Sequence, residues 1–403
     1  MAVNISSSTN SVEIFNHDLQ KHFQELLKFE STPEMETSAI YAEIRPKVER
    51  ILNAVVQENF SVAEAIAPGS GIITALAWNI ERGCIFQGIV DALRNHDGLK
   101  DKDVLLLTEL DYGMARSDNR FVAQEIARQF QLNYAFAPVY IALQKGSGVE
   151  AEISGENTKS IHGLAMFSKY PIKNAHAIPL PNGKDKMWGK EKRLGYLRAL
   201  VADIKHPAGT FRAVSVHLDA HCSRAHRHLQ MKIILDHLDT LPQIPVLVGG
   251  DWNTTTFNAQ SARRAILGYW RRVMMGVKNV VKNHYPHPDR YFERKLFGEL
   301  EGRGYEYKSL NESGAGTIHY DVGSIEKNTN LRDWVPEWCF PFIFWAANRV
   351  GGRVSGRLDW FAGKGIKLSP GTEPQTIGDL VNSEGVPLSD HDAISLDFTL
   401  SKR

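Results

Sequence analysis

The stretch from Ile244 to Asn253 constrains the fold more than any other part of the chain. It reads I-P-V-L-V-G-G-D-W-N. Its apolar, β-branched first half predicts a strand buried on both faces, although so short a run does not exclude a buried helix. Two glycines then allow a tight turn or a close approach to a ligand. Asp251 and Asn253 are alternate residues, so both can face one pocket; the alternative is an ordinary Asp/Asn turn.

The bulk composition excludes several classes of protein. A chain of 403 residues is long enough either for one large α/β domain with insertions or for two domains. Its 47 basic and 46 acidic side chains leave a net charge of +1, which gives no global argument for nucleic-acid binding. Cys84, Cys222 and Cys339 lie far apart without C-x-x-C spacing. They are expected as reduced thiols, not as a disulfide framework or a zinc knuckle.

No segment predicts export or insertion into a membrane. The first ten residues lack the basic start and apolar core of a signal peptide. No run approaches the ~20 apolar residues that a membrane span needs. We therefore expect a cytoplasmic protein without a stable membrane span.

Changes of pattern divide the chain into two predicted parts. From about residue 11 to 66, apolar residues recur at helical spacing, so residues 1–67 are expected to form an N-terminal helical extension. Packing on the main domain is the favoured role of this extension, and a partner-binding arm is the alternative. A Pro/Gly/Ser cluster then marks the entry to a domain at 68–403. The less regular segment near 257–350 is interpreted as an insertion that shapes substrate access.

The main domain alternates predicted strands with helices and loops. Helices are expected at residues 119–130 and 224–241, and the pattern near Pro207 predicts a hairpin turn. The predicted strands, besides the opening one, are residues 72–80, 104–110, 134–143, 163–167, 197–204, 211–218, 357–362 and 393–398.

Polar side chains follow almost every one of these apolar strands. They are Asn79, Glu81, Glu109, His217, Asp219, Asp251, Asn253, Asp359, Asp390 and His391. Each alone has an ordinary structural explanation: Glu109 as a surface acid, His217 as a core histidine, Asp390 as a cap. Because a sheet brings strand ends together, the whole set is expected to converge. Such carboxylates and amides suit Mg²⁺ or Mn²⁺, and the histidines suit phosphate oxygens or proton transfer.

Six motifs in order give the chain a resemblance to a known family. They are W-N-I-E, L-L-L-T-E, V-H-L-D, G-G-D-W-N-T, R-L-D-W-F and S-D-H. Between Ile72 and Phe398 the chain resembles the endonuclease/exonuclease/phosphatase (DNase I-like) superfamily. The resemblance implies a four-layer α/β sandwich, in which two packed, mostly antiparallel sheets are flanked by helices. It also implies hydrolysis of a phosphodiester or phosphomonoester with a divalent cation.

The resemblance further implies a role for each strand-end residue. Glu109 would be the principal Mg²⁺ ligand, with Asn79, Glu81 and Asp390 on the metal side. His391 would be the catalytic histidine and Asp359 the residue that orients it.

On the other side of the implied site, Asp251 and Asn253 would position the attacking water or the scissile phosphate. His217 would stabilise the transition state. Asp251 is expected as the base, and His391 as phosphate ligand or acid.

The expected substrate is a phosphoester of nucleic acid, a phospholipid headgroup or an inositol phosphate. Arg357-Leu358 precede Asp359 where inositol phosphatases of this superfamily usually have W-C, which counts against that branch. Arg116 is expected close to substrate. Other arginines are candidates for nucleic acid, although solvated helix faces explain most of them: Arg120, Arg263, Arg264, Arg271 and Arg272.

An aromatic patch in the insertion comprises Trp334, Trp338, Phe340, Phe342, Phe344 and Trp345. We expect it to be buried in the core of the insertion; the alternative is contact with a membrane, as in sphingomyelinase-like members of the superfamily.

Two other functions compete with the phosphoesterase interpretation. A zinc hydrolase would use the cluster His217, His221, His226 and His228, but would leave the strand-end acids unexplained. A non-catalytic binding member of the same fold would lack a motif residue, and none is missing.

Overall fold

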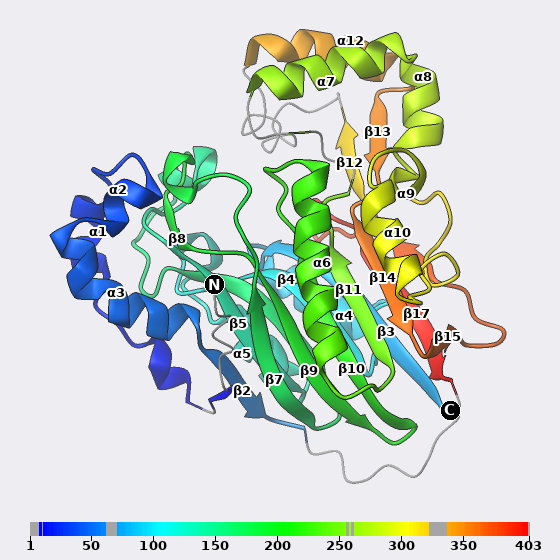
Figure 1. The fold of residues 1–403 in the computed structure, drawn as a ribbon, viewed down its shortest axis with the longest axis horizontal. Helices are drawn as coiled ribbons and strands as arrows, with labels where there is room; N and C mark the ends of the chain where they lie inside the picture. The colour runs from blue at the N-terminus through cyan, green and yellow to red at the C-terminus, as the bar shows by residue number, and fades with distance from the viewer. Residues whose placement is uncertain are drawn as a thin grey trace.

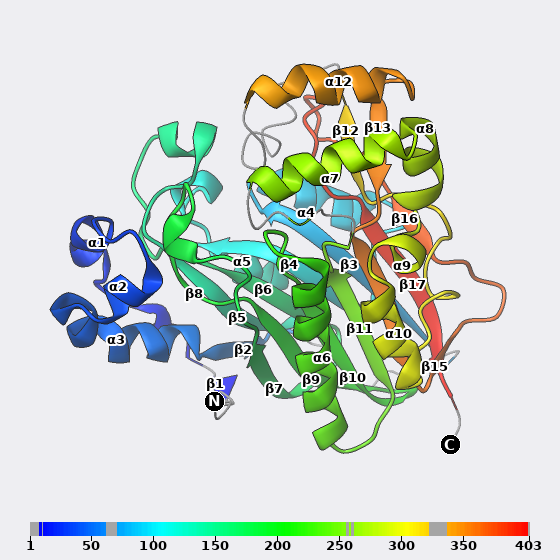
Figure 2. The same cartoon turned by 45° about the horizontal axis from the view of Figure 1, so that its top comes forward.

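The computed structural model describes residues 8–9, 11–61, 71–254, 258, 262–321 and 337–401. Two β-sheets pack face to face, with helices on their outer surfaces (Figures 1 and 2). The four-layer α/β sandwich predicted from the sequence is confirmed. Within the described segments, every helix is too short or too polar to cross a lipid bilayer.

The larger sheet contains the strands that follow the N-terminal segment and the last strand of the chain. In spatial order it runs through β1 (Ser8–Thr9), β2 (Val55–Asn59), β5 (Asn133–Ala142), β6 (Ile161–Ser168), β4 (Val104–Tyr112), β3 (Ile72–Arg82), β17 (Ala393–Leu400) and β15 (Ile366–Leu368). Two short strands join it from the side: β8 (Arg193–Gly195) pairs with β5, and β16 (Gln375–Ile377) with β17.

The smaller sheet comes from the middle of the chain. Its order is β14 (Asp359–Lys364), β11 (Val246–Asp251), β10 (Gly209–His217), β9 (Arg198–His206) and β7 (Ile172–Pro179). The opening stretch of the sequence therefore forms β11, parallel to β10 and antiparallel to β14. The predicted hairpin is confirmed as the antiparallel pair β9–β10. A separate two-stranded sheet pairs β12 (Ile318–Asp321) with β13 (Arg353–Gly356).

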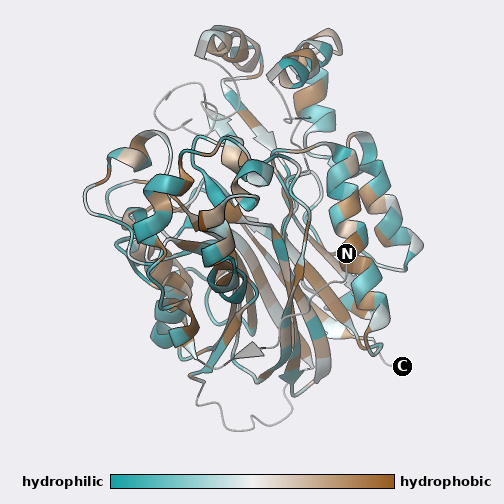
Figure 3. Ribbon diagram, turned by 60° about the vertical axis from the view of Figure 1, so that its left-hand side comes forward, coloured by the Kyte–Doolittle hydropathy of each residue, from teal (hydrophilic) through white to brown (hydrophobic). Residues whose placement is uncertain are grey.

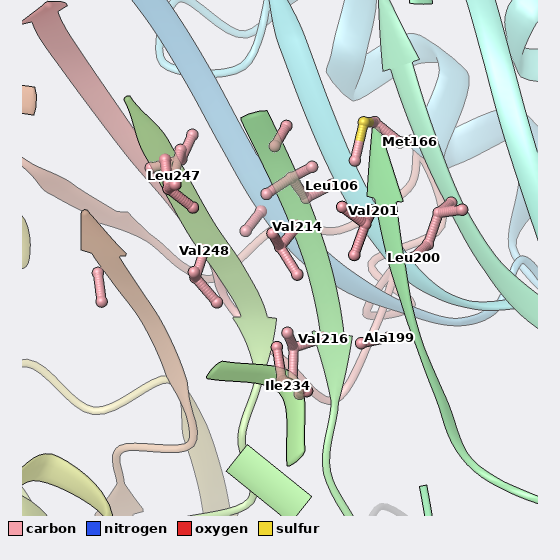
Figure 4. Close-up of a cluster of buried hydrophobic side chains, with 14 of the residues drawn as sticks. Leu106, Met166, Ala199, Leu200, Val201, Val214, Val216, Ile234, Leu247 and Val248 are labelled. Atoms are coloured by element: carbon pink, nitrogen blue, oxygen red, sulfur yellow. The ribbon is translucent and has the colours of Figure 1, made fainter. Parts of the chain in front are cut away.

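Strands of the larger sheet are buried on both faces because both faces are covered. In β3, Ala75 and Ala77 face the smaller sheet, whereas Leu76 and Trp78 face the outer helices. Figure 4 shows the inner layer, where Leu106 of the larger sheet lies near Val214 of the smaller one. Figure 3 shows these central strands largely in brown, with teal on the outer helices.

Amphipathic helices complete the outer layers. Helices α4 (Phe86–Asn95) and α5 (Val122–Gln129) cover the larger sheet, and α6 (Arg224–Thr240) and α10 (Arg294–Gly302) cover the smaller one. Short turns and helices connect them: η2 (Ala115–Ser117), η3 (Gly148–Glu152), η4 (Lys186–Trp188), α8 (Val277–Asn279), η5 (Val280–His284) and α9 (Pro288–Tyr291).

The N-terminal segment is helical only in part. It forms η1 (Val12–Phe15), α1 (Gln20–Leu26), α2 (Thr32–Glu36) and α3 (Ala39–Leu52). The predicted helical pattern beyond Leu52 is wrong, because residues 55–59 form β2 and pair with β5. A Val-Val pair followed by polar residues continues a helical pattern in the sequence, but here it begins a strand that lies between β1 and β5 and has one buried end.

The insertion carries two helices that stand away from the sheets. These are α7 (Ala262–Met274) and α12 (Phe340–Asn348), which follows the short turn η7 (Glu337–Cys339) (Figures 1 and 2). The expected burial of the aromatic patch is wrong for Trp338, Phe342 and Trp345, which are exposed, whereas Phe340 is buried. Trp334 lies outside the described residues.

The packing of Phe15 predicts that the N-terminal segment unfolds together with the main domain. Its buried ring makes edge-to-face contacts with Tyr112, Phe121 and Phe136. We expect Phe15→Ala to cost about 3–5 kcal/mol of unfolding free energy in one cooperative transition. Calorimetry measures this, with the exposed Glu13→Ala as control. Two separate transitions in the wild-type protein would instead make residues 1–67 an independent unit.

Candidate functional site

Two parallel strand pairs bring the polar strand ends to one edge of the sandwich. β3 and β4 end side by side in the larger sheet, and β10 and β11 end side by side in the smaller one. In the smaller sheet, Asp251 is the partner of His217 on one side and of Asp359 on the other. β17 starts just after His391 and runs antiparallel to β3. Because the two sheets pack face to face, these ends meet across the sandwich.

The backbone takes unusual conformations where these strands end. Glu81, Glu109 and Asn253 have φ values of 44°, 57° and 52°, in the left-handed region that non-glycine residues rarely occupy. A bulge interrupts the β3–β4 pairing between Asn79 and Arg82. Such irregularities turn side chains out of the regular alternation and are common beside active sites.

Gly250 is needed for strand packing. Its φ is 129°, and a Cβ there would lie 2.2 Å from the carbonyl oxygen of Val216. At Gly250, the close approach that the two glycines predict is made to the neighbouring strand of the sheet.

One side of the site gathers oxygen atoms suited to a hard cation. The Asn79 amide nitrogen donates to Glu109 Oε1 over 3.1 Å and to Asp251 Oδ2 over 3.3 Å. The backbone N–H of Asp390 donates to Glu81 Oε2 over 3.2 Å. Ser389 ties the segments together by donating to the Asn79 carbonyl oxygen over 2.7 Å. Glu81, Glu109, Asp390 and Asn79 thus lie around one end of the β3–β4 pair.

The charge balance on this side fits a divalent cation. Burial raises the pKa of Glu81 to about 8, and the Asp390 carboxylate adds to this effect. Burial likewise raises the pKa of Asp390, with the Glu109 charge contributing. Burial alone would also raise the pKa of Glu109, but the charges of Arg82 and His217 hold it below its ordinary value. A divalent cation among these oxygen donors would favour the ionised form of all three.

The other side of the site holds two imidazoles around Asp251. His391 Nδ1 donates to Asp359 Oδ2 over 2.8 Å, which fixes the orientation of the ring. Its Nε2 then lies 3.8 Å from Asp251 Oδ2, and His217 Nε2 lies 3.4 Å from the same oxygen. Burial would lower the pKa of His391, but the carboxylates of Asp359, Asp251 and Asp390 raise it well above its ordinary value.

Asp359 itself is completely buried. Burial raises its pKa to about 6, although the His391 charge opposes this. Leu358 and Asp359 both donate their backbone N–H groups to the Thr317 hydroxyl oxygen. Trp78 donates its indole N–H to the His391 carbonyl oxygen over 2.9 Å, so the backbone of the histidine is held as well as its ring.

Asp251 and Asn253 are joined by two hydrogen bonds. The Asn253 backbone N–H donates to Asp251 Oδ1 over 2.9 Å, and its amide donates to Asp251 Oδ2 over 3.1 Å. The same amide donates to the Leu218 carbonyl oxygen over 2.9 Å. These bonds hold the Asp251 carboxylate in one orientation, with one oxygen facing the imidazoles.

Among the described residues, Asp251, Asp359 and His391 each offer a ligand atom within 4.8 Å of the others. We consider the Glu109 side the better cation site, because His391 Nδ1 and Asp359 are already joined by a hydrogen bond. The Glu109 side instead combines carboxylate and amide oxygens, which Mg²⁺ and Mn²⁺ prefer.

Some expected residues lie elsewhere. Asp219 is buried and accepts the backbone N–H groups of Gly183 and His221. The histidines of the zinc alternative do not converge: His226 Nε2 lies 2.9 Å from the Pro181 carbonyl oxygen and His228 Nε2 3.2 Å from Glu299.

Arg116 is not placed to contact substrate as expected. It is buried and donates to both oxygens of Asp111 and to one of Glu150. The other Glu150 oxygen accepts from Arg82, whose Nε lies 3.9 Å from Glu109 Oε2. Arg82 is the site residue that sequence reasoning missed; the signal was a basic residue directly after W-N-I-E.

The raised pKa of Glu81 predicts a pH-dependent response to cations. Without a cation, folding favours protonated Glu81, so its contribution to stability is complete below about pH 4.5 and is lost as pH rises through about 8. Mg²⁺ should therefore raise the melting temperature more at pH 8 than at pH 5, where it must displace a proton. Differential scanning fluorimetry measures both shifts. Glu81→Gln should weaken this pH dependence and the exposed Glu384→Gln should keep it; equal shifts at both pH values in the wild type would contradict the assignment.

Among solved structures, the chain is similar to an endonuclease/exonuclease/phosphatase from Beutenbergia cavernae (14% identity over 82% of this chain and 72% of that chain, TM-score 0.47). It is also similar to a conserved protein of unknown function from Enterococcus faecalis (14% identity over 82% of this chain and 100% of that chain, TM-score 0.45). A third similar structure is truncated Caenorhabditis elegans TDP2 (15% identity over 81% of this chain and 97% of that chain, TM-score 0.42).

A search of curated proteins gave no match. The model of the endonuclease/exonuclease/phosphatase family, however, matches residues 76–392, which is most of the chain. The chain therefore belongs to this family, whose members are phosphoesterases and nucleases that usually depend on a divalent metal ion.

Proposed function

We propose that the protein is a Mg²⁺- or Mn²⁺-dependent phosphoesterase that hydrolyses a phosphodiester or phosphomonoester by attack of water. One observation carries this proposal. A single oxygen of Asp251 lies within 3.8 Å of two imidazoles, beside the partly buried carboxylates of Glu81, Glu109 and Asp390, and Arg82 lies next to Glu109. This arrangement gives an imidazole side and a cation side that meet at Asp251, where the substrate phosphoryl group would bind.

The cation side would consist of Glu109 as principal ligand, with Asn79, Glu81 and Asp390 around it. A bound cation would supply positive charge against the non-bridging phosphate oxygens and the leaving oxygen. The chain contributes the orientation of the donors. Asn79 supports Glu109 by its amide hydrogen bond, and Arg82 keeps Glu109 ionised.

Asp251 is assigned as the general base that activates the attacking water. Its carboxylate is fixed by the backbone and amide of Asn253, so it presents one oxygen in a constant direction. A general base must lie within hydrogen-bond reach of the proton that it removes, and Asp251 is the acid that borders both sides of the site. Asn253 would hold the water or the scissile phosphate.

The two imidazoles would neutralise charge on the phosphoryl group. The carboxylates around His391 raise the pKa of its imidazole above the ordinary value, so His391 suits the role of phosphate ligand or acid. Asp359 acts through His391 and is a positioning residue. His217 approaches from the other sheet and would stabilise the transition state.

The proposed substrate is a phosphoester of nucleic acid or of a phospholipid headgroup, with inositol phosphates less favoured by the residues before Asp359. Arg116 is left out of the proposed substrate contacts because carboxylates surround it. The scattered positions of His221, His226 and His228 give no support to zinc hydrolysis.

Three substitutions test the proposal. Glu109→Gln, Asp251→Asn and His391→Ala should each lower kcat by about 10²–10³ or more, because each removes charge stabilisation or the base. The assay is Mg²⁺-dependent hydrolysis of bis(p-nitrophenyl) phosphate and p-nitrophenyl phosphate, with circular dichroism to verify folding.

The matched control is His228→Ala, a histidine remote from the site that should keep near-wild-type turnover. Stoichiometric zinc surviving dialysis, together with loss of activity in His228→Ala, would support the zinc hydrolase instead. Near-wild-type turnover by Asp251→Asn and His391→Ala would sink the phosphoesterase site.

A further inference from the structure

The helices α7 and α12 expose an unusual set of large apolar side chains. Leu267 and Met274 of α7 are 71% and 80% exposed, and Trp338 of η7 is 62% exposed. We call the whole set the α7–α12 ridge; it comprises Leu267, Trp270, Met274, Trp338, Phe342 and Trp345. Both helices stand beyond the sheets in Figures 1 and 2. Exposed apolar patches of this kind mark interaction surfaces.

The ridge is one surface because the two helices touch. The rings of Trp270 and Phe342 pack with centroids 5.7 Å apart, and the Tyr269 hydroxyl donates to the Phe342 carbonyl oxygen over 2.5 Å. Within α7, Leu267, Trp270 and Met274 follow at intervals of three and four residues, so they share one side of the helix. Trp338 and Trp345 extend the apolar surface through η7 and α12.

The charge of α7 and of the residues that follow it has one sign. Residues 262–288 contain four arginines and two lysines but no aspartate or glutamate, a net charge of +6. Arg263, Arg264 and Arg271 are exposed on α7 itself. Arg271 lies four residues after Leu267 and three before Met274, so cationic and apolar side chains share the outer face of this helix.

A cationic cavity adjoins the ridge. It has a volume of about 310 Å³ and lies between α7 and the first residues of α6 and α10. Five arginines line it, and none of its described lining residues is acidic: Arg224, Arg264, Arg271, Arg272 and Arg294. The Arg272 guanidinium lies 4.6 Å from the ring centroid of Phe292, which holds it flat. Arginine side chains that converge on one cavity suit phosphate oxygens.

We propose that the α7–α12 ridge docks the protein onto an anionic phospholipid surface, with a lipid phosphate bound in the adjoining arginine cavity. Tryptophan, phenylalanine and leucine beside arginine are what an interfacial helix presents to lipid headgroups and upper acyl chains. A nucleic acid would account for the arginines and the aromatic rings. A bound nucleic acid would, however, leave the apolar side chains of Leu267 and Met274 exposed to water, whereas a lipid bilayer would bury them.

The ridge is connected to the candidate site. Strand β13 follows α12 and pairs with β12, and Ile318 of β12 forms an isolated bridge with His391. Docking is nevertheless independent of the proposed function, because no ridge residue belongs to the Glu109 or His391 sides of the site. Binding to lipid can therefore be measured on a protein without cation and without activity.

Vesicle flotation of the full chain in EDTA tests the proposal. Wild type should bind vesicles of phosphatidylcholine with phosphatidylglycerol, bind phosphatidylcholine alone far more weakly, and lose affinity as salt is raised. The double variant Leu267→Glu/Met274→Glu should bind at least about tenfold more weakly. Arg271→Glu should lose about an order of magnitude, since it changes two charges near the surface.

Matched controls separate the ridge from general effects of charge. Val381→Glu/Val386→Glu adds two acids at other exposed apolar positions, and Arg50→Glu reverses a charge on the exposed end of α3. Both should bind like wild type. Melting temperatures verify folding, and the single variant Met274→Gln replaces the double variant should that fail to fold.

Several outcomes would overturn the proposal. The proposal is wrong if the wild-type protein does not bind anionic vesicles. It is also wrong if a ridge variant binds them as well as the Val381→Glu/Val386→Glu control does. Binding of single-stranded DNA that depends on Arg271 but not on Leu267 and Met274, without vesicle binding, would reassign the cavity to nucleic acid. His391→Ala should bind vesicles like wild type, so failure of the proposed phosphoesterase function and failure of docking are distinguishable.

Discussion

The register of three neighbouring strands determines the rest of the site. Pairing of β10 with β11 puts His217 beside Asp251, and pairing of β11 with β14 puts Asp359 on the other side. Because side chains alternate along strands, a slip of one residue would turn these groups to the opposite face. The dense packing of Gly250 against the Val216 carbonyl oxygen makes such a slip costly. Sheet packing and site geometry are therefore consequences of the same pairing.

Electrostatics explains how the carboxylates on the Glu109 side of the site would respond to a cation. Burial and neighbouring carboxylates raise the pKa values of Glu81 and Asp390, whereas Arg82 and His217 hold the pKa of Glu109 below its ordinary value. Arg82 offsets part of the negative charge beside Glu109. A divalent cation would offset more of it, and the remaining positive charge would be available to a phosphate.

The sequence predicted much of this arrangement because strand alternation and motif order are local signals. The β9–β10 hairpin and the convergence of strand ends follow from apolar periodicity, whereas the sandwich was implied by the resemblance of the six ordered motifs to a known family. Other features depend on tertiary packing. Arg82 was missed because only the bulge after Asn79 turns it toward Glu109. Strand β2 and exposed Trp338 were mispredicted because a Val-Val pair fits either element, and hydropathy does not show whether an aromatic helix finds a partner surface.

The central claim is that the strand ends form one site with a cation side and an imidazole side. Electron paramagnetic resonance of Mn²⁺ binding tests it most directly, because it reports the cation without requiring turnover. The account predicts one bound Mn²⁺ per wild-type chain, strongly weakened binding in Glu109→Gln, and retained binding in His391→Ala. Equal binding in Glu109→Gln and wild type, or loss of binding in His391→Ala alone, would contradict this division of the site.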